Sequence, residues 1–405
     1  MKDRIWVVSE LYYPEQTSSG YFLTHIAEGL AADYDVCVVS GQPSYSERGI
    51  RAPRYEERNG AHINRVRSSH FDKDRLALRA VNLVSFTLSV FWFALRRFRE
   101  GDKLLVVTNP PTLAILLGLV ARWRRCKSVF LVHDVYPEFL FATKVLRPDS
   151  WIARVLGRVS AWTYRLYDEV VVLGRDMKEV VGRKLGERRE QIEIIPNWGD
   201  VDEIVPIRPE DNAFRREHGL DGSFVVQFSG NIGRSHDVEM LLDAARSLRD
   251  EPRIRFLFVG YGGKSSLVQE ARRAGLDNVL FLPRQPRERL AEMLCSSDAT
   301  VISFVDGMYG LSVPSRMYNV MAAGVPIIAI AHPQAELSLT VAEGGAGWVV
   351  EPRTSEALVT LLRRLATVEG TAEARSRGAA GRALAESQFT LASVLESYRA
   401  VFARL

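Results

Sequence analysis

Short apolar runs alternate with longer, helix-like stretches along the chain. In the first half, the runs of strand length are Ile5–Val8, Val36–Val39, Leu104–Val107, Val129–Val132, Val170–Leu173 and Ile192–Ile195. In the second half, they are Phe224–Phe228, Arg255–Val259, Val279–Leu282, Ala299–Ser303, Ile327–Ile330 and Gly347–Val350. Continuous apolar strands separated by helices are typical of parallel sheets covered on both faces. The pattern predicts an α/β protein with two Rossmann-like, doubly wound parallel-sheet domains.

The two sets of strands are separated by a break in this pattern. Pro206, Pro209 and a cluster of acidic residues interrupt the alternation there. We therefore expect the first domain over residues 1–205 and the second over residues 206–385. The last stretch, residues 386–405, ends in a helix-like pattern.

One segment of the first half, residues 80–95, carries no charge and includes several aromatic residues. It is shorter than the about 20 apolar residues that a membrane span needs. Asn82, Ser85 and Ser89 form a narrow polar stripe, and three arginines follow at Arg96, Arg97 and Arg99. This pattern, with a second apolar stretch at Leu113–Ala121, favours helices that lie in a membrane interface. The alternative is two ordinary core-facing helices.

Composition and charge narrow the class of protein. Of 405 residues, 47% are hydrophobic and 25% charged, which excludes a disordered chain, a collagen-like fibre and a bundle of membrane spans. The three cysteines, Cys37, Cys126 and Cys295, have no disulfide or zinc spacing, so no metal site is expected. Residues 1–200 hold 30 Lys and Arg against 24 Asp and Glu. This excess suits an acidic membrane surface or a phosphorylated partner, or is simply a solvated surface.

The start of the chain resembles a first buried strand rather than a targeting peptide. Ile5–Val8 is too short for a signal core and polar residues follow it. We therefore expect a cytoplasmic protein, associated peripherally with the inner face of the inner membrane if the apolar helices act as described above. No nucleic-acid partner is expected.

Ligands of open α/β sheets bind at the carboxyl ends of the strands, so the loops there carry the candidate chemistry. The first strand is followed by a small-residue turn that ends at Gly20, where a ligand can approach the backbone. The spacing is not that of the Gly-x-Gly-x-x-Gly fingerprint, which argues against a dehydrogenase. The fourth strand ends in His133 and Asp134, where a substrate would lie. The alternative for His133 is a buried, hydrogen-bonded core histidine.

Two loops of the second half suit a phosphorylated ligand. The first runs Ser229-Gly230-Asn231-Ile232-Gly233-Arg234-Ser235-His236 after a buried strand. There, Arg234 would offer a cationic fork and exposed amides would offer donors for a diphosphate. The second loop contains Gly260 and Gly262, which would let a backbone segment pass close to a nucleotide base.

The most informative stretch is residues 303–326. A strand ends at Ser303, a glycine-bearing loop follows, and Pro314 precedes a helix predicted over Ser315–Ala323 that stops at Gly324. Amides around Val313–Arg316 and the Arg316 side chain would stabilise a phosphate.

This stretch resembles the donor-binding segment of the retaining GT-B glycosyltransferases, and its Pro-Ser-Arg-Met-Tyr-Asn-x-Met-Ala-Ala-Gly-x-Pro form resembles the branch that builds exopolysaccharides and O-antigens on lipid carriers. Supporting matches cover nearly the whole chain. Ile195–Trp198 resembles the Pro-Asn-Gly segment before the hinge, Ser229–Gly233 resembles the first loop of the second domain, and His133-Asp134 resembles the acceptor-domain histidine.

The resemblance implies two Rossmann-like domains that face a cleft, with the acceptor on the first and a nucleotide-sugar, UDP-linked, on the second. It implies a terminal helix that crosses back to the first domain, and metal-independent transfer of a hexosyl or N-acetylhexosaminyl group with retention of configuration. The acceptor is expected to be a sugar on a polyprenyl diphosphate, and the donor is a substrate, so no cofactor is expected. The implied donor-binding residues are Gly20, Asn197, Gly230, Asn231, Gly233, Arg234, His236, Gly260, Gly262, Ser312, Val313, Pro314, Ser315, Arg316 and Asn319. The implied catalytic residues are His133, Asp134 and Asp306.

The sequence departs from the family pattern at the charged positions. Asn319 stands where many members have the glutamate that binds the ribose, and Leu311 where they have the other glutamate. Asp306 is the nearest acid and is expected to contact the donor sugar. Asn231 and His236 replace the usual arginine and lysine of the first loop, so Arg234 is expected to supply their charge.

Two other functions fit the same architecture. A sugar-nucleotide 2-epimerase would act on a nucleotide-sugar without an acceptor and would not need the apolar helix. A non-catalytic partner subunit of a glycosyltransferase complex would explain the missing glutamates, and it would bind no donor.

Overall fold

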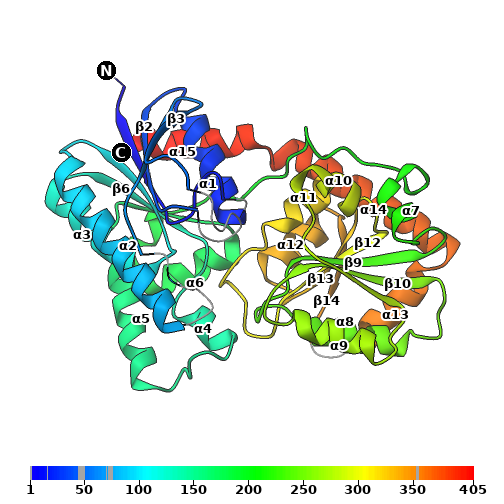
Figure 1. Cartoon of the computed structure of the whole chain (residues 1–405). Helices are drawn as coiled ribbons and strands as arrows, with labels where there is room; N and C mark the ends of the chain where they lie inside the picture. Colours follow the sequence, from blue (N-terminus) through cyan, green and yellow to red (C-terminus); the bar gives the residue numbers. More distant parts are fainter. Residues whose placement is uncertain (1, 16, 44–50, 70, 72–75, 353–354) are drawn as a thin grey trace. The chain divides into compact units, whose positions relative to one another are not determined.

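The protein is described by a computed structural model that covers residues 2–15, 17–43, 51–69, 71, 76–352 and 355–405 (Figure 1). Within these residues the chain divides into two units. The first unit comprises Met1–Glu138, Arg147–Pro196 and Ala392–Leu405, and the second comprises Phe139–Leu146 and Asn197–Leu391.

The first unit is built on one sheet with the strand order β3-β4-β2-β1-β5-β6-β7-β8. Its strands are β1 (Arg4–Val8), β2 (Asp35–Ser40), β3 (Tyr55–Arg58), β4 (Ala61–Arg65), β5 (Lys103–Val107), β6 (Lys127–Val132), β7 (Glu169–Val172) and β8 (Ile192–Ile194). Its helices are α1 (Ser18–Leu30), α2 (Leu76–Arg97), α3 (Pro111–Arg124), α5 (Trp151–Tyr164), α6 (Arg175–Leu185) and α15 (Leu391–Arg404), whereas α4 (Glu138–Ala142) begins at Glu138 of this unit and otherwise belongs to the second unit. The central strands are buried throughout, because helices cover both faces of the sheet.

The helices of the first unit form two groups. α2 packs on α3, α3 on α5 and α5 on α6, so these helices lie side by side along the sheet (Figure 1). α15 packs against α1 instead: a Cβ added at Gly29 would lie 2.3 Å from Leu395 Cδ1, and Arg399 Nε donates to Asp33 Oδ2 at 2.6 Å. The last helix of the chain therefore belongs to the first unit.

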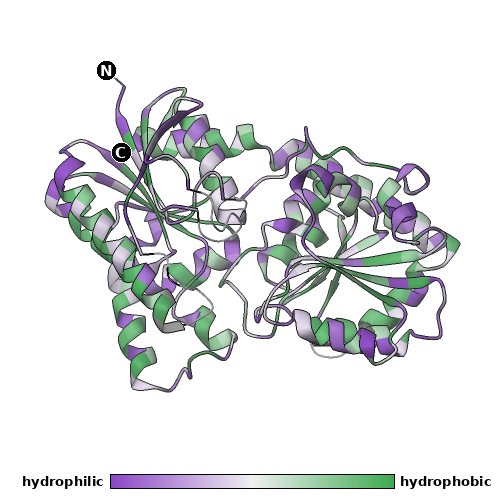
Figure 2. Ribbon diagram, viewed as in Figure 1, coloured by the Kyte–Doolittle hydropathy of each residue, from purple (hydrophilic) through white to green (hydrophobic). Residues whose placement is uncertain are grey.

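The second unit has a parallel sheet with the strand order β11-β10-β9-β12-β13-β14. Its strands are β9 (Phe224–Asn231), β10 (Ile254–Tyr261), β11 (Val279–Leu282), β12 (Ala299–Ser303), β13 (Ile327–Ile330) and β14 (Gly347–Val350). Its helices are α7 (Ala213–Glu217), α8 (Val238–Ser247), α9 (Ser265–Arg273), α10 (Leu290–Leu294), α11 (Arg316–Ala322), α12 (Glu336–Glu343), α13 (Ser355–Leu365) and α14 (Val368–Gln388). Figure 2 shows hydrophobic residues concentrated along the strands of both sheets.

Each strand predicted from an apolar run is present, and the fold class is confirmed. The sequence missed β3 and β4, and β3 pairs antiparallel with β4, so the first sheet is not purely parallel. Both strands are short and rich in polar residues, because they lie at the sheet edge. Asn59-Gly60 joins them with positive φ at both residues, which is the ordinary signal of a tight hairpin. The three cysteines are free and buried, as expected.

The boundary between the units lies at Pro196/Asn197, whereas the sequence placed it at 205/206. The intervening residues are bound to the second unit. Arg382 of α14 donates to Val201 O at 2.8 Å and to Ile204 O at 2.6 Å, and Gly199 N donates to Phe389 O at 3.0 Å. The stretch with Pro206 and Pro209 therefore comes after the boundary, because the segment before it is hydrogen-bonded to the second unit.

Candidate functional site

The carboxyl ends of β9 and β10 are held together by glycines. Gly230 pairs with Gly260 in the register of the two strands. Gly260 has a φ of +141°, and a Cβ there would lie 1.9 Å from Gly230 O. Gly262 has a φ of +155°, and a Cβ there would lie 2.5 Å from Ile232 O. Only glycine fits these two positions. Their first role is thus the close approach of two backbone segments within the unit.

The loop after β12 leads into α11 as the sequence predicted. α11 spans Arg316–Ala322 between the caps Ser315 and Ala323, against a prediction of Ser315–Ala323. Gly324 follows with a φ of +67° and ends the helix. Val313 and Pro314 are buried, whereas Ser312 and Ser315 are half-buried. The helix therefore presents its first residue, Arg316, next to the ends of the central strands.

Arg316 is the positively charged side chain at the start of α11. Its Nη1 donates to Ser229 O at 2.5 Å, and its guanidinium lies 4.7 Å from the centre of the Phe228 ring. Its Nη2 lies 2.7 Å from His236 Nε2. Burial lowers its pKa to about 10, so the side chain remains cationic at neutral pH. Among the described residues it forms no ion pair with a carboxylate. A desolvated cation without an anionic partner is an anion-binding group.

His236 is the polar neighbour of Arg316. Its Nδ1 lies 2.6 Å from Ser303 O, and its ring stacks on Phe304 at 5.6 Å between centres. Burial first, and then the charge of Arg316, hold the pKa of His236 well below its usual value. The imidazole is therefore neutral at physiological pH.

Arg234, which the sequence favoured as the phosphate ligand, lies elsewhere in the first loop. It is exposed, and in the part of the chain that the structure describes it makes no hydrogen bond or ion pair. Lys264, which the sequence reasoning missed, is nearer to His236. Its Nζ donates to His236 O at 2.8 Å and pairs with Glu239 Oε2 at 2.7 Å. Its charge is already neutralised, so among the described residues of this region Arg316 is the desolvated cation without a carboxylate partner, and Arg234 is an exposed one.

Asn231 and Gly233 of the first loop are accessible. Asn231 is exposed and Gly233 is half-buried, and a Cβ on Gly233 would lie 2.9 Å from Asn231 Nδ2. The main chain links this loop to the loop after β12, since Val305 N donates to Ser235 O at 3.0 Å. Asp306 follows directly; it is exposed, and its Oδ1 accepts from Gly307 N at 2.9 Å.

Asn319 is partly occupied by the protein itself. Its Oδ1 accepts from Asp200 N at 3.1 Å, just beyond Asn197 and Trp198, which are both buried. Asp200 is paired in turn with Arg287 at 2.6 Å. One of the two lone pairs of Oδ1 is thus occupied, and Nδ2 can donate to a ligand hydroxyl.

In the first unit, the strand ends bring His133 and Ser19 together. His133 Nδ1 lies 3.4 Å from Ser19 Oγ, and His133 N donates to Thr108 Oγ1 at 2.9 Å, at the end of β5. Burial lowers the pKa of His133 to about 4, although part of the residue remains accessible. A group with this pKa is neutral at pH 7 and accepts a hydrogen bond readily, but it takes up a full proton poorly.

Gly20 lies beside His133 in the first unit rather than with the other donor-binding candidates. It is in the first turn of α1, where its N–H donates to the capping Thr17 Oγ1 at 3.3 Å. A Cβ there would lie 2.9 Å from Glu15 O, so local crowding is also a reason for glycine at this position.

The segment after His133 is fixed by Lys184, a residue far from it in the chain. Lys184 Nζ donates to Glu138 Oε2 at 2.7 Å and to Tyr136 O at 3.2 Å. Asp134 is half-buried and contributes, after burial, to the raised pKa of Tyr164. No local pattern pointed to Lys184, because its partners lie far away in the chain.

Across the described residues, no group of three or more His, Cys, Asp or Glu side chains is arranged to hold a metal ion.

Comparison with known proteins identifies the family. The domain family "Glycosyl transferase 4-like domain" matches residues 19–198, and "Glycosyl transferases group 1" matches residues 210–382. The chain is also 30% identical over 384 residues to a protein of Pseudomonas aeruginosa named as the glycosyltransferase WbjE, which covers 90% of each chain. This chain belongs to the GT-B glycosyltransferases.

Two further proteins are similar to this glycosyltransferase. It is 28% identical over 377 residues to an Escherichia coli protein named as the colanic acid biosynthesis glycosyl transferase WcaI, over 89% of this chain and 91% of that one. The crystal structure of Anabaena HepE in complex with UDP-glucose has the same fold, with a TM-score of 0.74 and 16% identity over 99% and 100% of the two chains.

Proposed function

We propose that this glycosyltransferase moves a hexosyl or N-acetylhexosaminyl group from a UDP-sugar to a sugar on a polyprenyl diphosphate, in the synthesis of a cell-surface polysaccharide. Arg316 is the observation that carries the proposal. Within the part of the chain that the structure describes, it is a cation without a carboxylate partner, at the carboxyl ends of β9 and β12, where open α/β sheets bind their ligands. The UDP-glucose bound to HepE and the colanic acid role in the name of WcaI support the choice of substrates.

The chemistry follows from the charge of the leaving group. When the sugar–phosphate bond breaks, negative charge develops on the departing diphosphate, and a fixed cation stabilises that charge without reorganisation. Arg316 supplies the cation, so we expect transfer to continue in EDTA. Transfer with retention follows the family pattern. The remaining proposed donor contacts are Asn319 Nδ2 with the ribose and Asp306 with the sugar.

We place the acceptor in the first unit. His133, with Ser19 and Asp134 beside it, offers a neutral imidazole that accepts a hydrogen bond from the attacking hydroxyl. Because its pKa of about 4 makes it a weak base, the proton of the hydroxyl is expected to pass to the donor phosphate rather than to stay on His133.

Binding and transfer assays test this function. A nucleotide at 100 times its dissociation constant stabilises the folded chain by about 2.7 kcal/mol, so UDP-sugars are expected to raise the melting temperature and GDP-sugars are not. Labelled sugar should then appear on a polyprenyl-diphosphate acceptor. A chain that binds no nucleotide-sugar would instead be a partner subunit. One that converts a UDP-sugar without an acceptor would be an epimerase.

The outer surface of the first unit also carries an apolar face. On α2, the exposed side chains are Val81, Val84, Leu88 and Trp92, the last 54% exposed. The polar side chains of the same helix face inward: Asn82 exchanges hydrogen bonds with the main chain of Phe71 at 2.9 Å, and Ser85 Oγ accepts from Ser69 N at 2.7 Å. α2 therefore presents apolar side chains outward as well as to the core, where Phe86, Val90 and Ala94 are buried.

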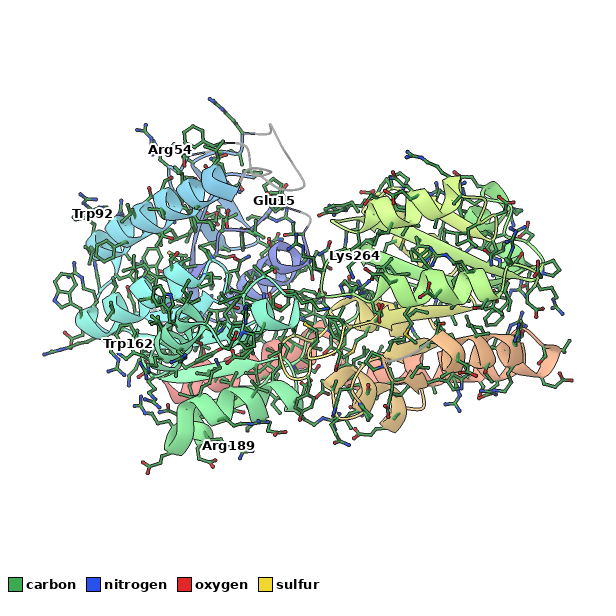
Figure 3. The ribbon with its side chains drawn as sticks, turned by 90° about the horizontal axis from the view of Figure 1, so that it is seen from below. Glu15, Arg54, Trp92, Trp162, Arg189 and Lys264 are labelled. Carbon is green, nitrogen blue, oxygen red and sulfur yellow. The ribbon has the colours of Figure 1, made fainter. Side chains whose placement is uncertain are left out.

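The apolar face continues over α3, which packs beside α2, and over α5, which packs beside α3. Its members on α3 and α5 are Leu119, Trp123, Trp151, Ile152, Val155, Leu156 and Trp162. Figure 3 labels Trp92 and Trp162, the tryptophans of α2 and α5. Exposed arginines accompany the face on the same helices and their ends: Arg96, Arg97, Arg122, Arg125, Arg154, Arg158 and Arg165. In the described part of the chain, no helix is both long enough and apolar enough to cross a bilayer.

We propose that this apolar face, Val81 to Trp92 of α2 with its continuation on α3 and α5, binds a bilayer that contains anionic lipids. Tryptophans with arginines beside them suit the interface between lipid chains and headgroups. Each apolar side chain removed from water contributes about 1.5–3 kcal/mol, and each arginine near an anionic surface about 1 kcal/mol. A polyprenyl diphosphate acceptor resides in such a bilayer.

The double variant Leu88→Ser with Trp92→Ser is expected to weaken partitioning onto phosphatidylglycerol vesicles by at least about 10-fold, because two exposed apolar side chains are lost. Vesicle co-sedimentation measures the partitioning. Val205→Ser is the matched control, since Val205 is an exposed apolar residue of the second unit. Unchanged partitioning of the double variant, or a wild type that stays off the vesicles, would refute the proposal.

A further inference from the structure

The ring of His236 has a defined tautomer. Its Nδ1 lies 2.6 Å from Ser303 O, and a carbonyl oxygen only accepts. Nδ1 therefore carries the hydrogen, and in the neutral ring Nε2 keeps its lone pair. A doubly protonated ring would place a second cation against Arg316.

Arg316 lies over the face of this ring. Its Nη2 lies 2.7 Å from His236 Nε2 and 3.1 Å from Nδ1, and an atom this close to both nitrogens lies above the ring and not in the direction of the Nε2 lone pair. The guanidinium is fixed at two further points, by donation to Ser229 O and by contact with the Phe228 ring. His236 is itself clamped between aromatic rings, stacked on Phe304 with 11° between the ring planes and at 72° to Phe228.

We propose that His236 is a positioning residue that holds the Arg316 guanidinium at the carboxyl ends of β9 and β12, rather than a ligand of the phosphates. The inference rests on the proposed donor site and assigns a different role to His236 within it. It explains why the first loop needs no cation of its own: the loop supplies a neutral ring that packs against the guanidinium, and α11 supplies the charge. A long arginine side chain that is held by three contacts loses less conformational entropy when a diphosphate binds.

Calorimetric binding of UDP to the full-length chain tests this role with two variants. His236→Leu removes the ring that faces the guanidinium, and is expected to weaken UDP binding by about 10-fold. His236→Phe keeps a flat ring between Phe304 and Phe228, and is expected to stay within about 3-fold of wild type. Uridine, which has no phosphate, should bind the wild type and both variants alike. If His236→Leu does not fold, as judged by its melting temperature, His236→Val takes its place.

A double-mutant cycle separates positioning from direct contact. If His236 acts through Arg316, His236→Leu should change UDP affinity by less than about 2-fold once Arg316→Gln is present. A full effect in that background would show that His236 binds the phosphates itself and would overturn the inference. Equal losses for His236→Leu and His236→Phe would overturn it as well. A wild type that binds no nucleotide at all would refute the proposed function instead, so the two failures are distinguishable.

Discussion

Arg316→Gln is expected to lower kcat/KM for sugar transfer by about 100- to 1000-fold, the usual loss when one group that stabilises developing negative charge is removed. The substitution removes the cation and leaves an amide that can still donate to Ser229 O. Since the charge is needed most when the diphosphate departs, kcat should fall along with the affinity for the donor. Initial rates over a range of donor concentrations, with acceptor saturating, measure both parameters.

The matching substitution Arg234→Gln discriminates between the two candidate cations. Arg234 is exposed and free to move, and an exposed charge contributes little because water screens it. We expect a loss of ~10-fold or less. The reverse order, with Arg234→Gln the more damaging change, would return the phosphate site to the first loop. The melting temperature without nucleotide should be similar in both variants, because Arg316 has no ion pair in the described structure to lose.

Arg215→Ala is expected to destabilise the second unit by about 3–5 kcal/mol, the range observed when one partner of a buried ion pair is removed. Arg215 of α7 is buried and pairs with Asp298 at 3.0 Å. Its guanidinium also donates to Ser296 O, Leu220 O and Ser223 O. Asp298 Oδ2 accepts in turn from Val225 N at 2.8 Å, at the start of the central strand β9. The variant leaves a buried carboxylate without its cation.

Denaturant unfolding monitored by tryptophan fluorescence measures this loss. Arg216→Ala is the control. Arg216 is the next residue of α7 and is exposed, and its Nη1 donates to Glu210 O at 2.9 Å. It should change stability by no more than about 0.5 kcal/mol. Equal unfolding midpoints for the two variants would show that the Arg215–Asp298 pair does not hold the unit together.

The strands of both sheets were predictable because they are buried on both faces. A run such as Val129–Val132 has no polar position to alternate with, so its burial is visible in the sequence itself. β3 and β4 were not found, since a polar edge strand such as Tyr55–Arg58 has no such run. Only the Asn59-Gly60 turn signalled them.

The orientation of α2 illustrates a second limit. The sequence showed a polar stripe through Asn82 and Ser85 and predicted an interfacial helix, but periodicity gives no direction. In the structure the stripe faces the protein, because Ser69 and Phe71 offer main-chain partners there. The apolar side chains away from this stripe, such as Leu88 and Trp92, are consequently exposed.

The sequence by itself determined the α/β class, the succession of buried strands along the chain, the short helix predicted over Ser315–Ala323, and the family, because each depends on neighbours in the chain. Only the tertiary structure decided which cation lies at the strand ends. Arg234 follows β9 directly, yet its side chain is exposed. Arg316 comes much later in the chain, but its guanidinium reaches Ser229 O and His236. The register of parallel strands and the packing of α11 bring these groups together, and such contacts between distant residues leave no local pattern in the sequence.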